Sequence, residues 1–403
     1  MRSKSVDILV IGAGPSGCAA ASYLAMHGHR VVIADSAQFP RDKTCGDGIS
    51  PLAVRMLIRL NVLSQVESEG AFRIENVLIQ SPMGKMNRSR FDESLGANEY
   101  ALAMPRIDLD SILLKYALSS GAEAMLHTRI EEVQTDGDLI TSLTAKHLDS
   151  NVRVKIQPRH VIFAVGANIG FLRRCGFTVN TQNVSLATRS YYSTSIPLPK
   201  DYALYFDEEL IPGYGWVFPV ANQRANIGIG VVRGRHRATS NIEMLDAFIN
   251  RRVNQEVLCG VTREDDVKGY PIRSDYGTQR IAGANWMLVG EAAGLVNPLT
   301  GEGIDLALYS GILASECLHA GIGLSQPYSR LYEAELSRRF RLLFVGWRIC
   351  RNLLLRRHIM DRIVHTMSVD SELRSLIVKM GLGLESPISL AHPKWLYRVI
   401  RSR

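Results

Sequence analysis

A glycine-rich turn near the start of the chain has the spacing of a phosphate-binding turn. Residues 12–17 read Gly-Ala-Gly-Pro-Ser-Gly and lie between an apolar, strand-like run and an alanine-rich, helix-like run. The first glycine permits a tight turn, the second lets a diphosphate approach the backbone, and the third allows helix and strand to pack closely. Asp35 closes the next apolar run, 18 residues after Gly17, where a carboxylate accepts hydrogen bonds from ribose hydroxyls. This context favours a dinucleotide site over a glycine turn kept for packing alone.

A second glycine-rich segment, in the last third of the chain, favours FAD over NAD as that dinucleotide. Residues 285–294 form an apolar strand-like run that ends at Glu291 in a turn of small residues, and residues 297–305 lead into a helical pattern. The carboxylate can bind ribityl hydroxyls, and N–H groups at the helix start can face the flavin edge where negative charge collects on reduction. The alternative is an ordinary strand-to-helix connection with an N-cap.

The elements that must position these residues predict an α/β fold. Residues 6–34 read as strand, turn, helix and strand, and a buried strand at 160–164 ends at Gly166. Between them and the second glycine segment, residues 184–232 alternate apolar and polar in the manner of an antiparallel sheet. We therefore predict a Rossmann-type FAD-binding domain with an inserted antiparallel β-sheet substrate domain and a C-terminal helical region.

Three regions follow from these patterns. We expect a discontinuous FAD-binding domain from residues 1–70, 101–170 and 270–322. Residues 71–100 and 171–269 are assigned to a substrate or cap domain, and residues 323–403 to a basic helical region.

Composition narrows the class of protein. Apolar residues make up 46% of the 403 residues and charged residues 21%, so the chain can bury a large core. The six cysteines form no CxxC pair and no zinc-type spacing, which favours reduced thiols and no metal site. A strand pattern begins almost at once and no apolar run reaches membrane-spanning length, so we expect a cytoplasmic protein.

The positive charge gathers at the C-terminal end. Residues 338–403 carry a net charge of +10, whereas the remainder carries −2. Basic amphipathic helices with Trp and Phe are typical of peripheral contact with anionic lipid surfaces. The alternative is a packed helical domain with a solvated arginine face. No nucleic-acid-binding motif accompanies the charge.

Together the motifs resemble the glutathione-reductase-like FAD superfamily, and most closely the geranylgeranyl reductase family, which includes the menaquinone-side-chain reductases. Residues 12–17, 39–48, 212–219 and 290–304 carry the likeness, and Arg106 adds the family's arginine before a helix. Glu291 departs from the family's usual Asp. After Ser325 no motif is recognised.

The resemblance implies a non-covalently bound FAD, with Cys45 near its isoalloxazine ring, Ile130 near adenine and Arg106 near the ribose and diphosphate. The alternatives are a small apolar residue in a tight loop for Cys45 and a surface residue for Arg106. The residues assigned to FAD are Gly12, Ala13, Gly14, Pro15, Ser16, Gly17, Ala34, Asp35, Arg41, Thr44, Cys45, Gly46, Asp47, Gly48, Arg106, Ile130, Gly166, Gly290, Glu291, Gly294, Gly301, Gly303 and Ile304.

The implied activity is saturation of C=C bonds in a polyprenyl chain, of geranylgeranyl type, by hydride transfer from reduced flavin. The catalytic candidates are Cys45, Asp47, Tyr214 and Trp216, and the proton donor stays open among Cys45, Asp47, Tyr214 and water. Tyr214, Trp216 and Phe218 alternate on one expected strand, where they either line an apolar tunnel or form ordinary core. With Pro298 they are the substrate candidates.

Two other functions remain open from the sequence. One is an FAD-dependent monooxygenase or halogenase of a small apolar or aromatic substrate, although Tyr214 and Phe218 stand where halogenases carry Trp and Ile. The other is a non-catalytic scaffold that binds prenyl lipids. The electron donor, NADPH or a ferredoxin-type reductant, stays open because no second nucleotide-binding motif is found.

Overall fold

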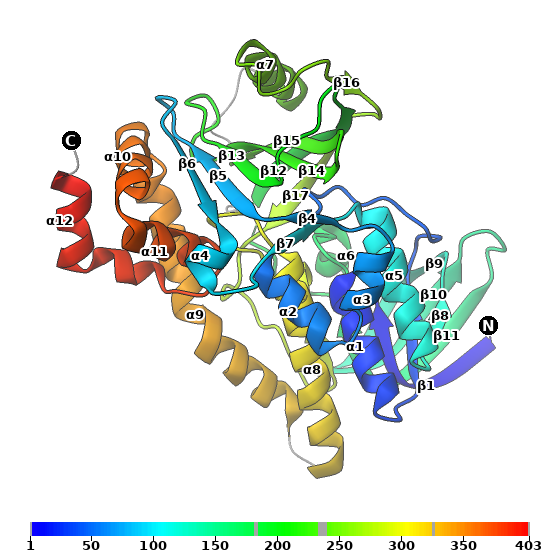
Figure 1. Cartoon of the computed structure of the whole chain (residues 1–403). Helices are drawn as coiled ribbons and strands as arrows, with labels where there is room; N and C mark the ends of the chain where they lie inside the picture. Colours follow the sequence, from blue (N-terminus) through cyan, green and yellow to red (C-terminus); the bar gives the residue numbers. More distant parts are fainter. Residues whose placement is uncertain (1, 181–183, 233–239, 325–326, 402–403) are drawn as a thin grey trace.

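The computed structural model describes residues 2–180, 184–232, 240–324 and 327–401. Figure 1 shows two sheets of different architecture, with helices around one of them and a helical C-terminal region beside the other. The cavity described below is lined by residues from both sheets and from that C-terminal region.

The first sheet, here the Rossmann sheet, has a parallel part and an antiparallel ribbon. The parallel part has the strand order β8 (Glu123–Met125), β2 (Val31–Ala34), β1 (Arg2–Ile11), β11 (Arg153–Phe163) and β18 (Trp286–Leu288). β10 (Leu139–His147) and β9 (Thr128–Asp136) extend it antiparallel from β11. The core of β1 is fully buried, as expected for parallel strands covered on both faces.

Three helices tie the Rossmann sheet to the two glycine-rich turns. α1 (Pro15–Met26) follows β1 and packs against α8 (Ile304–Leu324) and α5 (Arg106–Ser119). Gly311 of α8 allows this close approach, because a Cβ there would lie 2.3 Å from the Ser16 carbonyl oxygen. The predicted Rossmann-type arrangement is therefore confirmed.

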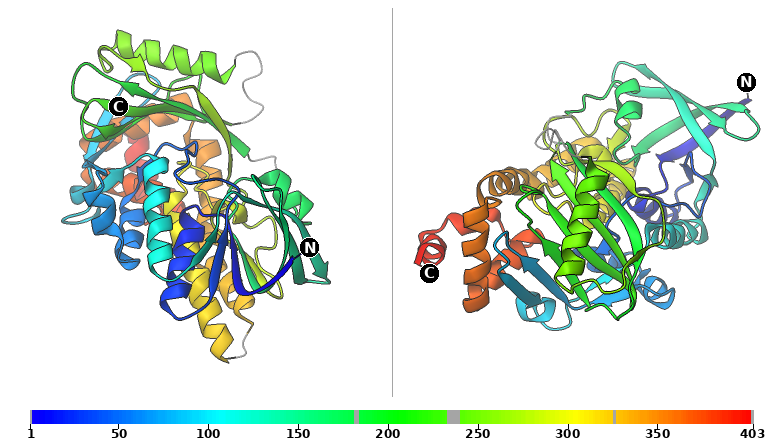
Figure 2. Two further views of the ribbon diagram at one scale, coloured as in Figure 1. Left: turned by 90° about the vertical axis from the view of Figure 1, so that its right-hand side faces the viewer. Right: turned by 90° about the horizontal axis from the view of Figure 1, so that it is seen from above.

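The second sheet, here the cap sheet, covers the site. Its strand order is β16 (Thr262–Arg263), β12 (Val184–Ser193), β15 (Arg224–Val232), β14 (Tyr214–Ala221), β13 (Asp201–Tyr205), β5 (Asn76–Gln80) and β6 (Met86–Arg90). β17 (Lys268–Arg273) also pairs with β12, and among the described strands of this sheet β13 and β5 are the one parallel pair. Figure 2 shows α7 (Asn241–Asn254) lying across the outer face of this sheet, where Phe248 and Leu245 are buried.

Short elements bridge the two sheets. β3 (Gly48–Ile49), β7 (Ala101–Ala103) and β4 (Phe72–Ile74) form a small sheet of their own. Nearby lie α2 (Pro51–Arg59), α3 (Leu63–Ser68) and α4 (Phe91–Leu95), while α6 (Ile169–Arg174) follows β11. The cap sheet thus draws strands from residues 76–90 and from 184–273.

The C-terminal region is helical and packed. It consists of α9 (Tyr328–Leu354), α10 (Arg357–Val369), α11 (Ser371–Gly381), the 3-10 turn η2 (Pro387–Ala391) and α12 (Pro393–Arg401). α10 contacts β6 and α11 contacts α4, so the region closes one end of the cap sheet (Figure 1). Within the described residues, no helix is long and apolar enough to cross a membrane.

Candidate functional site

One large cavity of about 630 Å³ joins the two sheets and the C-terminal helices. At one end it is lined by the turns that follow β1 and β2, and at the other by apolar side chains of α10 and α11. This position, beyond the carboxyl ends of parallel strands, is where α/β sheets bind their ligands.

The β1–α1 turn at the polar end is shaped for a diphosphate. Gly12 has a φ of 106°, and a Cβ there would lie 2.3 Å from the Ala164 carbonyl oxygen; one on Gly17 would lie 1.9 Å from the Gly12 carbonyl oxygen. Gly14 faces open space: beyond its chain neighbours, a Cβ there would come nearest to Arg41 and Arg106 nitrogens, at 3.8 and 3.9 Å. A diphosphate fits between these guanidinium groups and the N-terminus of α1.

A buried carboxylate holds the two arginines at this turn. Asp110 accepts from Arg106 Nε and Nη2 at 2.6 and 2.7 Å, and it lies 3.0 Å from Arg41 Nη1. Arg106 is itself buried, so the alternative of a surface residue at a helix start is wrong. Two guanidinium groups and one carboxylate leave a positive charge beside Gly14, which suits an anion.

Asp35 and Glu291 both face the cavity with part of their carboxylate already engaged. Asp35 accepts from the N–H groups of Ala13 and Ala37 at 2.7 and 2.8 Å. Glu291 accepts from the N–H of Arg273 at 3.1 Å. These hydrogen bonds fix each carboxylate and leave further acceptor sites for sugar-type hydroxyls.

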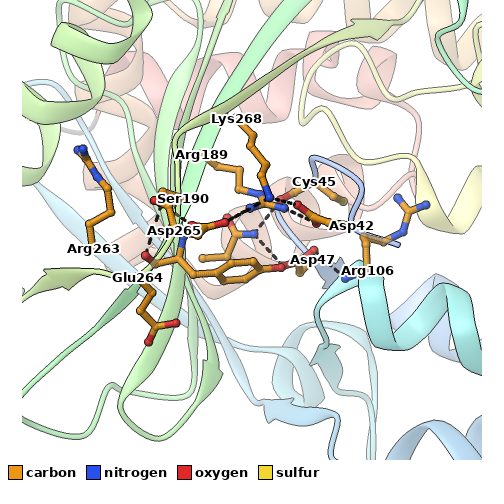
Figure 3. Close-up of polar contacts among 12 residues, drawn as sticks. Asp42, Cys45, Asp47, Arg106, Arg189, Ser190, Arg263, Glu264, Asp265 and Lys268 are labelled. Atoms are coloured by element: carbon orange, nitrogen blue, oxygen red, sulfur yellow. Dashed lines mark hydrogen bonds and ion pairs between the residues drawn. The ribbon is translucent and has the colours of Figure 1, made fainter. Parts of the chain in front are cut away.

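The loop that contains Cys45 places this residue at the cavity wall and turns Asp47 away from the cavity. Asp47 is fully buried and is absent from the cavity lining. Its carboxylate accepts from Tyr191 Oη at 2.5 Å, Asn226 Nδ2 at 2.8 Å and Arg106 N at 3.2 Å (Figure 3). Burial raises the pKa of Asp47 to about 6. The position of Asp47 suits an anchor of the loop. Burial also raises the pKa of the Cys45 thiol.

Asn226, which the sequence did not single out, joins this loop to the aromatic strand. Its amide donates to the Cys45 carbonyl at 2.7 Å as well as to Asp47, and its oxygen accepts from Trp216 Nε1 at 2.9 Å.

An ion-pair network around the buried Arg189 anchors the same loop at a second point. Arg189 and Lys268 converge on Asp42 (Figure 3). Asp42 lies 2.7 Å from Arg189 Nη2 and 2.6 Å from Lys268 Nζ, and Arg189 Nη1 lies 3.2 Å from Asp265. The side chain of Arg189 is fully buried. Because these charges come from β12, β17 and the loop, the network fixes the loop against the cap sheet.

Aromatic side chains of β14 form the middle of the cavity wall. Tyr214, Trp216 and Phe218 all line it, with neighbouring ring centroids 6.2 Å apart. Gly46 packs beneath them, since a Cβ there would lie 3.3 Å from the Phe218 ring. The Tyr214 hydroxyl donates to the Thr300 carbonyl, and burial raises the pKa of this phenol.

The apolar end is built by the C-terminal helices, a role that the sequence did not reveal. Met360, Ile363, Val364 and Met367 of α10 recur at helical spacing, and all four face the cavity. The spacing could have shown a buried face, but not what that face meets. The other lining side chains of this end include Leu355, Ile377, Val378 and Met380.

Two titratable residues at the wall were also missed. Glu302 lines the cavity, and its Oε1 is buried without a hydrogen-bond partner among the described residues. Burial, aided by repulsion from Asp305, raises the pKa of Glu302 well above its usual range. Lys43 lies 3.2 Å from the centroid of the Tyr270 ring, and burial lowers the pKa of this amine to about 8.

Most of the residues assigned from the sequence line the cavity, Pro298 and Ile130 among them. Five do not. Outside the lining lie Ala13, Gly17 and Asp47, together with Gly290 and Gly294. The second glycine segment holds Gly290 and Gly294 at φ values of 58° and 76°. That segment forms the 3-10 turn η1 (Gly290–Ala293) before α8.

Comparison with known families indicates which dinucleotide this fold binds. The FAD binding domain family matches residues 5–320, which is most of the chain. The chain belongs to this FAD-binding family. The turn at Gly14, with Arg41 and Arg106 beside it, has space and charge for the diphosphate of FAD, so we treat the protein as a flavoprotein.

Relatives place the flavoprotein near prenyl reductases. It is 32% identical over 360 residues to a menaquinone reductase of Mycobacterium tuberculosis, a match that covers 87% of this chain and 84% of the relative. It is 29% identical over 405 residues to a digeranylgeranylglycerophospholipid reductase of Methanoculleus marisnigri, covering 98% and 97%. The resemblance to the geranylgeranyl reductase family is confirmed.

Solved structures support the fold. A geranylgeranyl bacteriochlorophyll reductase-like protein from Thermoplasma acidophilum superposes with a TM-score of 0.84 and 21% identity over the full length of both chains. A flavin-dependent brominase, Bmp2, gives 0.79 and 16% over 98% of this chain and 99% of its own. Reductases and halogenases therefore share this architecture, and fold alone does not separate them.

Proposed function

We propose that this flavoprotein saturates C=C bonds of a polyprenyl chain, using hydride from reduced FAD and a proton from the protein. The observation that carries the proposal is the continuous cavity. The cavity runs from the β1–α1 turn at Gly14, past Tyr214, Trp216 and Phe218, to an apolar end lined by methionines. A long apolar chain fits such a space, and a small polar substrate does not need it.

The residues at the polar end would hold the cofactor. The N-terminus of α1 with Arg41 and Arg106 would bind the diphosphate, and Asp35 and Glu291 the sugar-type hydroxyls. Bound FAD supplies two-electron hydride chemistry. The protein fixes the Cys45 loop through Asn226 and Arg189, and the cap sheet excludes water from the reacting bond.

The proton is assigned to Glu302 in this proposal. An isolated alkene needs one hydride and one proton for each bond saturated, and positive charge develops on one carbon between the two additions. Glu302 lies at the cavity wall, and burial, aided by repulsion from Asp305, raises its pKa well above the usual range, which favours the protonated form. Burial raises the pKa of the Cys45 thiol, and the Tyr214 hydroxyl already donates its proton to the Thr300 carbonyl. Tyr214 and Trp216 would face the developing charge.

The reaction also needs an electron donor and a source of substrate. The electron donor is NADPH or a ferredoxin-type reductant, and the substrate is a prenyl lipid met in the cytoplasm at a membrane surface. The names of the two relatives, a menaquinone reductase and a digeranylgeranylglycerophospholipid reductase, support an isoprenoid substrate.

The proposal is tested by a single turnover without oxygen. The purified protein is reduced anaerobically and mixed with a geranylgeranyl-bearing lipid, and the visible absorbance of oxidised flavin is followed. Return of that absorbance with the lipid, and not with its fully saturated analogue, supports ene reduction. No return without oxygen, but an oxygenated product in air with NADPH, would replace the proposal with a monooxygenase.

A further inference from the structure

Helix α9 carries a row of apolar side chains that nothing covers within the described part of the chain. Leu342, Val345, Ile349 and Leu353 expose 70%, 41%, 51% and 49% of their surface. Their spacing of three and four residues puts them on one line along the helix. We call these four residues the α9 stripe.

The rest of α9 shows that the stripe is not a loosely packed core. Phe344 and Trp347 of the same helix are almost fully buried. On another side, a Cβ placed on Gly346 would lie 3.3 Å from Pro387, so η2 packs closely there. Ile388 of η2 is 56% exposed. The inward faces of α9 are thus well filled, while its outward face stays apolar.

The chain around the stripe is rich in arginine, although Arg338 pairs with Glu335 and Arg357 with Glu208. Residues 336–360 contain seven arginines and no Asp or Glu. Arg338, Arg341 and Arg356 are exposed near the stripe, and the nearest acid along the chain, Glu335, is 3.0 Å from Arg338 Nε. An apolar line rimmed by arginine matches an anionic lipid surface, where side chains enter the acyl boundary and guanidinium groups meet phosphates.

The same helix reaches the cavity. Arg351 and Leu355, at the end of α9, line the apolar end of the cavity, whereas Ile349 and Leu353 point outward. A bilayer that touches the stripe would therefore lie beside the part of the protein where the long apolar chain is proposed to bind.

We propose that the α9 stripe and its arginine rim dock the protein on an anionic bilayer, from which the prenyl lipid enters the apolar end of the cavity. Docking stands on the surface alone; lipid entry rests on the proposed function. A stable protein interface buries roughly 1,600 Å² in total. A single row of four side chains falls short of that area, which favours the bilayer over a protein partner.

The test uses the full-length holoprotein and sedimentation with vesicles. We expect binding to vesicles of phosphatidylcholine with phosphatidylglycerol, weaker binding in high salt, and little binding to phosphatidylcholine alone. The double variant Leu342→Asp/Ile349→Asp should reduce the bound fraction at least about tenfold, because both charges would have to enter the lipid boundary. The matched control, Ile58→Asp on α2, changes an equally exposed isoleucine and should bind as wild type.

Each other outcome has a defined meaning. Equal binding of wild type and the double variant overturns the proposal, and so does a wild type that ignores anionic vesicles. A wild-type dimer in light scattering that the double variant breaks assigns the stripe to a second copy instead. The double variant must retain flavin and its melting temperature, since a loss of fold would mimic a loss of docking; Leu342→Ser/Ile349→Ser serves if it does not.

A second readout separates docking from chemistry. With substrate dispersed in detergent, the double variant should turn over as wild type; with substrate in anionic vesicles it should be slower by a similar factor to its loss of binding. If no prenyl substrate is reduced by either protein but vesicle binding behaves as expected, the proposed function fails and the docking surface stands.

Discussion

At the scale of single residues, the chemistry of the site depends on which side chains reach the cavity. The Cys45-Gly46-Asp47 segment is a motif in sequence, yet only the first two of these residues face the cavity. Asp47 turns back with a φ of 62° to collect three hydrogen-bond donors. A motif gives residue types and spacing, and the direction of each side chain depends on partners such as Tyr191 that lie far away in sequence.

Replacing Glu302 tests the proton donor. In Glu302→Gln we expect a single-turnover rate lower by about a hundredfold, the usual contribution of a positioned general acid. Flavin affinity should stay near that of wild type, because the side chain's role is toward substrate. The control is Glu316→Gln, which lies on α8 outside the cavity lining and pairs with Arg59.

The pH dependence distinguishes a proton donor from a packing residue at this position. The wild-type rate should fall as pH rises through the raised pKa of Glu302, because the donor is then ionised. The rate of Glu302→Gln should lack this step. A variant that keeps the same pH profile at reduced rate would assign the residue a structural role.

Asp47 makes a separate prediction about stability. Its pKa rises from 3.8 to about 6 on folding, so the folded state binds this proton more tightly than the unfolded chain does. Its contribution is therefore greatest below pH 4 and falls as pH rises to about 6. Urea unfolding between these values, compared with Asp47→Asn, should show the wild type losing free energy of unfolding relative to the variant; a difference independent of pH would contradict this.

At the scale of elements, the site is held by the cap sheet as much as by the Rossmann turns. The glycine turns could be predicted because their geometry is local, as at Gly12 and Gly17. The anchors Arg189, Asn226 and Lys268 could not, because they lie on cap-sheet strands at least 140 residues from the Cys45 loop and their pairing is set by the sheet's register.

Asn226 gives the clearest test at this scale. Asn226→Ala removes partners from the Cys45 carbonyl, Asp47 and Trp216, and each buried polar group left unpaired costs about 1–3 kcal/mol. We expect a marked fall in flavin affinity, measured by fluorescence on release. Asn87→Ala, a buried asparagine of the same sheet away from the cavity, should leave affinity unchanged. Equal loss in both variants would mean general destabilisation.

At the scale of the whole molecule, the C-terminal region has both a buried face toward the cavity and an exposed apolar face. Its sequence indicated either a packed helical domain or a lipid-facing surface. The structure gives it a buried face toward the cavity, at Met360 and Met367, and an exposed apolar face on α9. Periodicity predicted the helices, since residues three and four apart share a face, but it carries no information on which surface each face meets.

The mass of the product tests the proposed C=C reduction most directly. The reduced holoprotein is incubated without oxygen with a geranylgeranyl-bearing lipid, and the lipid is analysed by mass spectrometry. We predict gains in steps of two hydrogens, each matched by the oxidation of one flavin. An unchanged lipid without oxygen, together with a gain of one oxygen atom in air with NADPH, would contradict this prediction.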